Sequence, residues 1–163
     1  TDRMAALIEE LLALAEQGKT VLDPEPASLE AVATAAWENV NTDEMELRIV
    51  DDAECMMDDS RVTQLFENLF RNAREHAGDD VTVRVGTVDG GFYLEDDGPG
   101  IPQSDRDNVL DSGFTTSEDG TGFGLAIVSQ IVDAHNWQVD VTAGTDGGAR
   151  FEFREVDRVP DRE

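Results

Sequence analysis

Two asparagines, Asn68 and Asn72, stand four residues apart in a stretch whose leucines and phenylalanines recur at helical spacing. Residues four apart on a helix share one face, and asparagine is a poor helix former whose amide needs a use there. A neutral amide oxygen is a suitable ligand for Mg²⁺, which keeps most of its waters and bridges phosphates. The pair indicates a metal and phosphate site, although two solvated helix residues would show the same spacing.

A carboxylate followed by glycines forms the second motif, Asp97-Gly98-Pro99-Gly100-Ile101. An ionised aspartate only accepts hydrogen bonds, so at the back of a pocket it would distinguish the exocyclic amine of adenine from the carbonyl of guanine. Glycines allow the backbone and a base to approach closely. Asp96 competes with Asp97 for this role, and an ordinary turn after a strand is the plain alternative.

Two further motifs indicate phosphate binding and closure over a ligand. A glycine-rich run leads into an apolar helix that we expect over residues 122–135. The run consists of Gly120, Thr121, Gly122, Phe123, Gly124 and Leu125, and its last residues begin the helix. Such a run directs backbone N–H groups and the positive end of the helix toward phosphates. Upstream, Phe114, Thr115, Thr116 and Ser117 lie in a polar stretch, residues 102–121, which predicts a short helix and a mobile loop.

In this order, the four motifs resemble the N, G1, F and G2 boxes of the sensor histidine kinase ATP-binding domain, within the gyrase–Hsp90–kinase–MutL superfamily. The resemblance covers roughly residues 28–155. It implies a Bergerat-type fold, ATP and Mg²⁺ as cofactors, Asn72 as the Mg²⁺ ligand supported by Asn68, and Asp97 as the adenine carboxylate. It also implies that Phe114 belongs to a lid that closes over the nucleotide.

The chain departs from the family at informative positions. ATP-hydrolysing relatives carry a glutamate where Asn68 stands, and Glu67 lies about 100° around the helix. Without a positioned general base, phosphoryl transfer to a protein side chain is favoured over hydrolysis. His76 stands where relatives have an aromatic or basic residue beside the base and ribose. Arg74 lies on the same helix and is either a phosphate ligand or an exposed surface charge. Ala149 replaces a hydroxyl that the family usually has.

Around these motifs we predict an α+β fold, a two-layer α/β sandwich with a mixed, mostly antiparallel sheet of about five strands and three main helices. The helices are expected over residues 29–41, 60–76 and 122–135. The strands are expected over residues 47–50, 53–57, 81–88, 92–96, 138–143 and 149–155, and the last four form two hairpins. Ser28 is the expected N-cap of the first helix, and Asp59 or Ser60 that of the second.

An apolar helix over residues 2–17 resembles the end of a dimerisation helix. We therefore divide the chain into a remnant of a dimerisation and phosphoacceptor hairpin (1–18), a linker (19–27), the ATP-binding domain (28–156) and a charged tail (157–163). Neither His76 nor His135 has the neighbours of a phosphoacceptor histidine, and His135 is expected to cap a helix C-terminus. The fragment is thus expected to bind ATP without phosphorylating itself.

The composition restricts the partners. The 163 residues include 37 Asp and Glu against 12 Lys and Arg, a net charge of −25. This charge disfavours nucleic acids and anionic membranes as partners. No apolar run reaches the length of a membrane span, and we expect a cytoplasmic location. Acidity spread along a chain whose one lysine is Lys19 is typical of a salt-loving, haloarchaeal cytoplasm, where salt screens repulsion. The single cysteine, Cys55, excludes an intrachain disulfide and is expected to be buried.

We interpret the chain as the catalytic domain of a two-component sensor histidine kinase that transfers the γ-phosphoryl group of ATP to a histidine outside this chain. A homodimer in the full-length protein and a response-regulator receiver domain are the implied partners. One alternative is an anti-sigma-factor-type serine kinase or ATPase of the same fold, which Asn68 and the helix over residues 2–17 disfavour. Another is a non-catalytic nucleotide-binding module, which the intact Asn72, Asp97 and glycine boxes disfavour.

Overall fold

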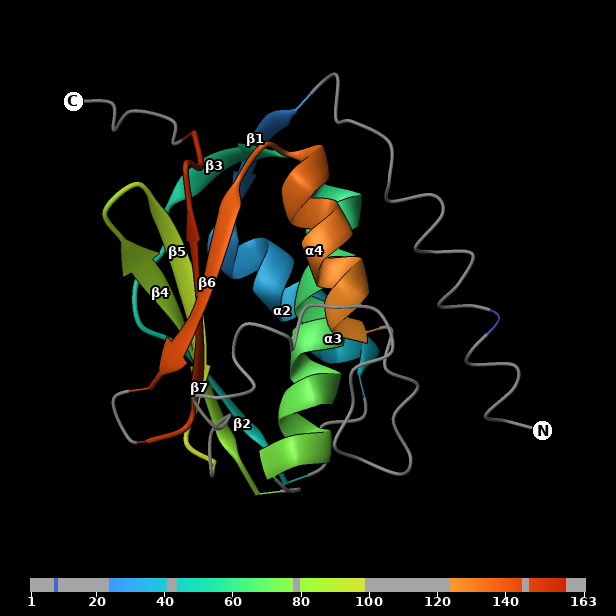
Figure 1. Ribbon diagram of the computed structural model, residues 1–163, viewed down its shortest axis with the longest axis vertical. Coiled ribbons are helices and arrows are strands. Elements are labelled where there is room, and N and C mark those ends of the chain that lie inside the picture. Colours follow the sequence, from blue (N-terminus) through green and yellow to red (C-terminus); the bar gives the residue numbers. More distant parts are fainter. Residues whose placement is uncertain are drawn as a thin grey trace.

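The computed structural model describes residue 8 and residues 24–40, 44–77, 80–98, 124–144 and 147–157, with the backbone alone at residues 75–77 and 124. Within these residues, three helices cover one face of a five-stranded sheet, and a two-stranded sheet adjoins one end (Figure 1). The predicted two-layer α+β sandwich is confirmed. The predicted helix over residues 2–17, apart from Ile8, and the tail beyond residue 157 lie outside the described residues.

The main sheet is mixed and mostly antiparallel, as predicted. Its strand order is β2 (Glu46–Ile49), β4 (Thr82–Val88), β5 (Gly91–Asp96), β7 (Ala149–Arg154) and β6 (Gln138–Ala143). β2 runs parallel to β4, and the other neighbours are antiparallel. Both predicted hairpins are present, and Gly90 and Gly147 in their turns have φ values of 77° and 88°, a conformation that glycine adopts without strain.

The small sheet changes the expected start of the domain. β1 (Glu25–Ser28) pairs antiparallel with β3 (Glu54–Met57), so residues 25–27 are a strand of the domain and not part of a linker. The proline-rich sequence there shows no strand periodicity, and the pairing with β3 is what makes it a strand. The Met56 N–H donates to the Asp157 carbonyl at 2.7 Å. The last described residue is therefore also held by this sheet.

The three helices are α2 (Leu29–Asn39), α3 (Asp59–Ala77) and α4 (Gly124–Ala134). Ser28 caps α2 as predicted, because its side chain accepts the Ala31 N–H at 3.1 Å. α3 begins with a different cap from either candidate. The Oδ1 of Asp58 accepts the Arg61 N–H at 3.2 Å, so Asp58 takes the role expected of Asp59 or Ser60.

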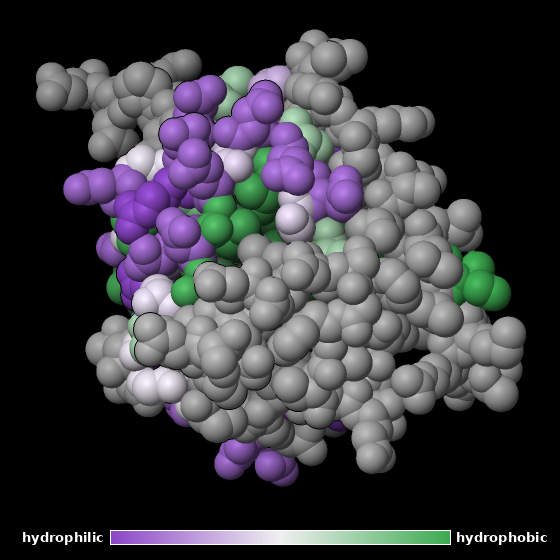
Figure 2. Space-filling model, in the orientation of Figure 1, coloured by the Kyte–Doolittle hydropathy of each residue, from purple (hydrophilic) through white to green (hydrophobic). Residues whose placement is uncertain are grey.

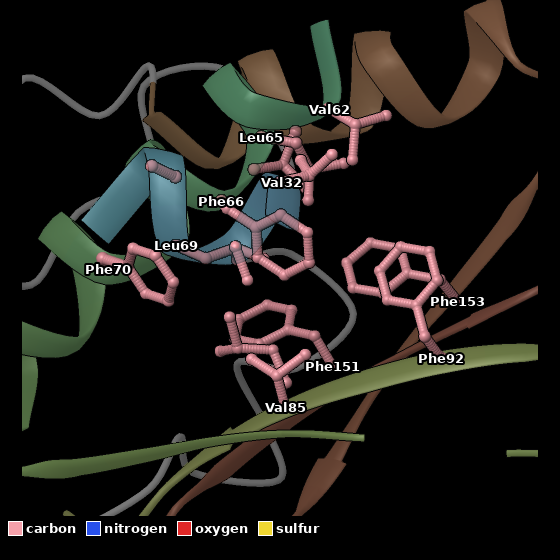
Figure 3. Packing of buried hydrophobic residues seen from close by; sticks show 14 of the residues in the cluster. Val32, Val62, Leu65, Phe66, Leu69, Phe70, Val85, Phe92, Phe151 and Phe153 are labelled. Atoms are coloured by element: carbon pink, nitrogen blue, oxygen red, sulfur yellow. The ribbon is translucent and has the colours of Figure 1, made fainter. Parts of the chain in front are cut away.

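The core lies between the helices and the sheet. The helical spacing of the apolar residues in α3 is confirmed, because the side chains at this spacing form a buried stripe of Val62, Leu65, Phe66, Leu69 and Ala73. Figure 3 shows phenylalanines of α3 directed toward those of β5 and β7. Phe92 stacks on Phe153 with ring centroids 4.7 Å apart, and Phe66 lies 5.8 Å from Phe92. Burial of such aromatic rings dominates core energetics.

The surface of the described part is polar. Among the coloured residues of Figure 2, hydrophilic side chains predominate, with a smaller apolar area among them. Ile8 and Val50 are the exposed large apolar residues found in the described ranges, whereas Cys55 is buried, as predicted. Among the helices of these ranges, none combines the length and the apolar character needed to cross a membrane.

Candidate functional site

The two asparagines lie in the C-terminal half of α3, at different depths. Asn68 is 4% exposed, and its Nδ2 donates to the Gln64 carbonyl at 2.8 Å. Asn72 is half-buried. One N–H of the Asn68 amide is bonded back into its own helix, so the second N–H and the amide oxygen are the groups that could orient a ligand or water. Asn72 is the more accessible of the two amides, which suits a metal ion that retains its waters.

Glu67 is turned toward α2. Its Oε2 accepts a hydrogen bond from Asn39 Nδ2 at 3.0 Å, and its Oε1 lies 4.0 Å from Arg71. Residues of α2 and α3 line a solvent-open groove of about 420 Å³ here: Asn39, Asp59, Ser60, Thr63, Gln64 and Glu67. This groove includes neither Asn68 nor Asn72 and lies on the N-terminal half of α3.

The two consecutive aspartates at the end of β5 have different surroundings. Asp96 is 6% exposed, and its Oδ1 accepts the N–H groups of Gly98 at 3.0 Å and Ala149 at 3.2 Å. Asp97 is exposed, and it exchanges two hydrogen bonds with Thr82, at 2.9 Å through Oδ1 and at 3.2 Å through its own N–H. The structure therefore favours Asp96 over Asp97 as the carboxylate of a pocket.

The sequence contains a signal that distinguishes the two aspartates. Successive residues of a strand point to opposite faces, and Phe92 and Leu94 of β5 are core residues. Asp96 continues their alternation toward the helix layer, whereas Asp97 does not. The family resemblance implied Asp97 as the adenine carboxylate, whereas the strand periodicity, extended by one residue, favours Asp96.

The β6–β7 turn approaches Asp96 closely. A Cβ at Gly148 would collide with the backbone oxygen of Asp96 and stand 2.5 Å from its Oδ1. Within the turn, the Gly144 N–H donates to the Gly148 carbonyl at 2.6 Å. Gly148 is thus a site residue that the sequence analysis missed, since its contact with Asp96 spans 52 positions of the chain.

The remaining predicted residues are described only in part. Gly98, Arg74 and Leu125 are half-buried, and α4 begins at Gly124, directly after the glycine run. In Figure 1, the C-terminal half of α3, the end of β5, the start of α4 and the β6–β7 turn lie in the same half of the molecule. Outside the described residues lie Gly100, Ile101, Phe114, Thr115, Thr116, Gly120, Thr121, Gly122, Phe123 and the side chain of His76.

His135 caps α4 as expected, but as a neutral ring that also reaches α3. Its Nδ1 donates to the Ile131 carbonyl at 2.8 Å, and its Nε2 accepts the Asp58 N–H at 3.0 Å. Burial lowers the pKa of His135, although the bond to Ile131 and the nearby Asp58 oppose this. Trp137 stacks on the ring at 4.2 Å. The imidazole therefore joins the end of α4 to the start of α3.

Comparison with known proteins identifies the family of this chain. Residues 57–159 match the family model described as Histidine kinase-, DNA gyrase B-, and HSP90-like ATPase. The chain therefore belongs to this family.

The individual relatives are sensor kinases. The sensor histidine kinase ZraS of Escherichia coli O157:H7 is 30% identical over 161 residues, which cover 92% of this chain and 35% of ZraS. The sensory histidine kinase/phosphatase NtrB of Rhodobacter capsulatus is 36% identical over 101 residues, 52% of this chain and 28% of NtrB. The chain thus spans about a third of the length of these relatives.

Solved structures of histidine kinases share the fold. The mycobacterial sensor histidine kinase MprB superposes with a TM-score of 0.68 and 26% identity, covering 82% of this chain and 97% of that one. Full-length ShkA in complex with AMPPNP superposes with a TM-score of 0.69 and 25% identity, covering 98% of this chain and 37% of that one.

Proposed function

We propose that this chain is the ATP-binding catalytic domain of a two-component sensor histidine kinase, and that it transfers the γ-phosphoryl group of ATP to a histidine outside the chain. The observation that carries the proposal is the buried carboxylate of Asp96, anchored by two backbone N–H groups at the end of β5. The asparagine pair of α3 and the names of the relatives support it. The complex of ShkA with AMPPNP supports a nucleotide as the ligand.

In this proposal each element contributes one kind of contact. Asp96 accepts the hydrogen bond of the adenine amine, a role first assigned to Asp97. The start of α4 and the glycine run before it present N–H groups to the phosphates. Gly98, Gly100, Ile101, Arg74 and His76 surround the base, ribose or phosphates, and Phe114 to Thr116 belong to the lid.

The asparagine amides are a donor set that suits Mg²⁺, a hard cation that takes oxygen ligands. Asn72 would hold the ion, and the buried Asn68 would orient Asn72 or a water. When bound, the ion would neutralise charge on the phosphates. Glu67 is engaged with Asn39 at 3.0 Å, so its carboxylate is not directed to activate water. This favours transfer to a protein side chain over hydrolysis.

The rest of the protein follows from the same proposal. Residues 1–18 would be the end of a dimerisation and phosphoacceptor hairpin, the full-length kinase a homodimer, and a receiver domain of a response regulator its partner. We further propose a cytoplasmic, high-salt environment for a chain of net charge −25. Thermal melts should then shift upward between dilute buffer and about 1 M KCl, where the Debye length falls to about 3 Å. A melting temperature independent of salt would contradict the high-salt proposal.

Binding of Mg-ADP to Asp96→Asn and Asp97→Asn, measured by calorimetry, tests the function. In Asp96→Asn an amide N–H₂ can face the adenine amine, and the loss should be about 1–3 kcal/mol, or roughly 5- to 100-fold in affinity. Asp97→Asn is the matched control and should bind within about twofold of wild type, since its partner is Thr82. Equal affinities for all three proteins would refute the adenine assignment.

Phosphotransfer tests the reaction itself. The fragment alone with labelled ATP should gain no acid-labile phosphate, whereas an added dimerisation segment with its histidine should be labelled. Asn72→Ala should abolish that labelling and leave the fold intact. Phosphoserine in place of phosphohistidine would instead support the serine kinase alternative.

A further inference from the structure

The outer face of the main sheet carries a buried ion pair, although no helix of the described residues covers this face. Glu95 is 3% exposed, and its Oε2 lies 3.3 Å from Arg150 Nη1. The Nε of Arg150 bonds Glu152 Oε2 at 2.7 Å, and its guanidinium carbon lies 3.9 Å from the centroid of the Tyr93 ring. Two carboxylates and one ring therefore fix the orientation of this guanidinium.

The pair lies directly behind the residues that hold Asp96. Glu95 and Arg150 are opposite each other in the ladder between β5 and β7. The next residues along the two strands are Asp96 and Ala149, which face the helix layer and are joined by the bond from the Ala149 N–H to Asp96 Oδ1 at 3.2 Å. Because side chains alternate across a strand, the outer pair and the inner hydrogen bond occupy adjacent positions of the same two strands.

Glu95 also contacts the turn that closes on Asp96. A Cβ at Gly144 would stand 3.1 Å from Glu95 Oε2, and the Gly144 N–H bonds the Gly148 carbonyl at 2.6 Å. Gly148 in turn packs against Asp96 so closely that no side chain fits there. The outer ion pair thus touches the end of β5, the start of β7 and the turn between β6 and β7.

Arg150 is the cation that pairs with both Glu95 and Glu152 on the outer face. Burial lowers the pKa of Arg150, but its bonds to Glu152 and Glu95 outweigh this, so the pKa of the guanidinium is raised. Removal of the guanidinium would take from the buried Glu95 carboxylate the partner that lies 3.3 Å away on β7. Breaking a buried ion pair by removing one partner is strongly unfavourable. Glu95 would then have to move toward water and shift the strand end or the turn with it.

We propose that Arg150, paired with Glu95, is a positioning residue for base selectivity: it holds the Ala149 N–H and Gly148 against Asp96 so that this carboxylate meets the adenine amine. The inference rests on the function proposed above, specifically on Asp96 as the adenine acceptor. Arg150 itself lies on the opposite face of the sheet from Asp96 and acts through the backbone of β5 and β7.

The test compares the affinities for ADP and IDP, since the hypoxanthine base carries a carbonyl in place of the adenine amine. Arg150→Met should weaken ADP binding about tenfold, the scale of one lost hydrogen bond, and leave IDP binding within about twofold of wild type. The ADP preference should therefore fall about tenfold. Arg150→Lys keeps the charge and should restore part of the preference. In an Asp96→Asn background, Arg150→Met should no longer change the preference for ADP over IDP.

Arg154→Met is the matched control. Arg154 lies on the same face of the same strand and pairs with the same Glu152, at 2.6 Å, but it is at the far end of β7 from Asp96. It should preserve the ADP preference even if it lowers the melting temperature as much as Arg150→Met does. An unchanged preference in both Arg150→Met and Arg150→Lys would overturn the inference and leave the Asp96 assignment intact. A wild-type chain that does not distinguish ADP from IDP would overturn both.

Discussion

Different interactions hold the two faces of strands β5 and β7, and the inner face is the more deeply buried of the two. The inner face presents Phe92, Leu94, Phe151 and Phe153 to the helix layer, all at 0–1% exposure. The outer face presents Tyr93, Glu95, Arg150, Glu152 and Arg154, joined by ion pairs of 2.6–3.3 Å and a cation–π contact. The first face is held by packing and the second by paired charges.

The outer face is also where this acidic chain gathers its cations. Seven arginines lie in the described residues, and four of them are on strands: Arg48, Arg84, Arg150 and Arg154. Arg48 is opposite Arg84, Arg84 is opposite Glu95, and Glu95 is opposite Arg150. Residues opposite each other in a ladder share a face. The scarce positive charges thus neutralise carboxylates on the open side of the sheet, whereas the inner side supplies the apolar burial that drives folding.

The largest contrast should come from truncating the inner face. Phe92→Ala removes a ring that stacks on Phe153 and contacts Phe66 and Trp137, and it should lower the free energy of unfolding by about 3–5 kcal/mol. Urea denaturation measures this. The comparison variant, Arg154→Ala on the outer face, should cost about 1 kcal/mol or less because its side chain is 40% exposed. Similar losses for both variants would contradict the division between the faces.

A smaller effect is expected where the inner face ends at Asp96. Gly148→Ala places a methyl group against Asp96, and overpacking of this kind typically costs about 1–3 kcal/mol. Because the obstructed residue is the proposed adenine acceptor, ADP affinity should fall as well. Gly147→Ala is the control, since it strains a backbone with a φ of 88° but has open space around its Cβ. It should lower stability and preserve ADP affinity, as calorimetry and thermal melts would show.

The smallest expected effect is a difference in the pH dependence of stability between the helix layer and the outer face of the sheet. The pKa of His135 is lowered by burial from 6.5, so the neutral ring stabilises the fold above that value and the stability is lost as pH falls toward the folded-state pKa. Burial raises the pKa of Glu152, but bonds from Arg150 and Arg154 lower it further, to below 4.5. Its contribution is therefore present above pH 4.5 and is lost only at more acidic pH.

Unfolding free energies measured at successive pH values test this separation. Between pH 7 and pH 5, His135→Gln should reduce the slope of the free energy of unfolding against pH. A single titrating group contributes at most about 1.4 kcal/mol per pH unit to this slope. His76→Gln is the control, and Glu152→Gln should alter the slope only below pH 4.5. An unchanged slope in His135→Gln would show that the ring is not held neutral.

Much of the architecture follows from local patterns. The stripe of α3, the Ser28 cap and the two hairpins with Gly90 and Gly147 were all predicted correctly, because each depends on residues within a few positions of one another. The order of the motifs likewise indicated the family, since it is a property of the chain and requires no knowledge of contacts.

Other features depend on partners that are distant along the chain. Asp96 differs from Asp97 because one bonds Ala149 and the other Thr82, and no local pattern contains either partner. The strand at residues 25–28 exists because β3 pairs with it, and His135 is neutral because the Asp58 N–H donates to it at 3.0 Å. The sequence alone therefore determined the three helices, the strands of the main sheet and the family they belong to. The partners of Asp96 and Asp97, the strand at residues 25–28 and the neutral ring of His135 came from hydrogen bonds that exist only once distant segments are packed together.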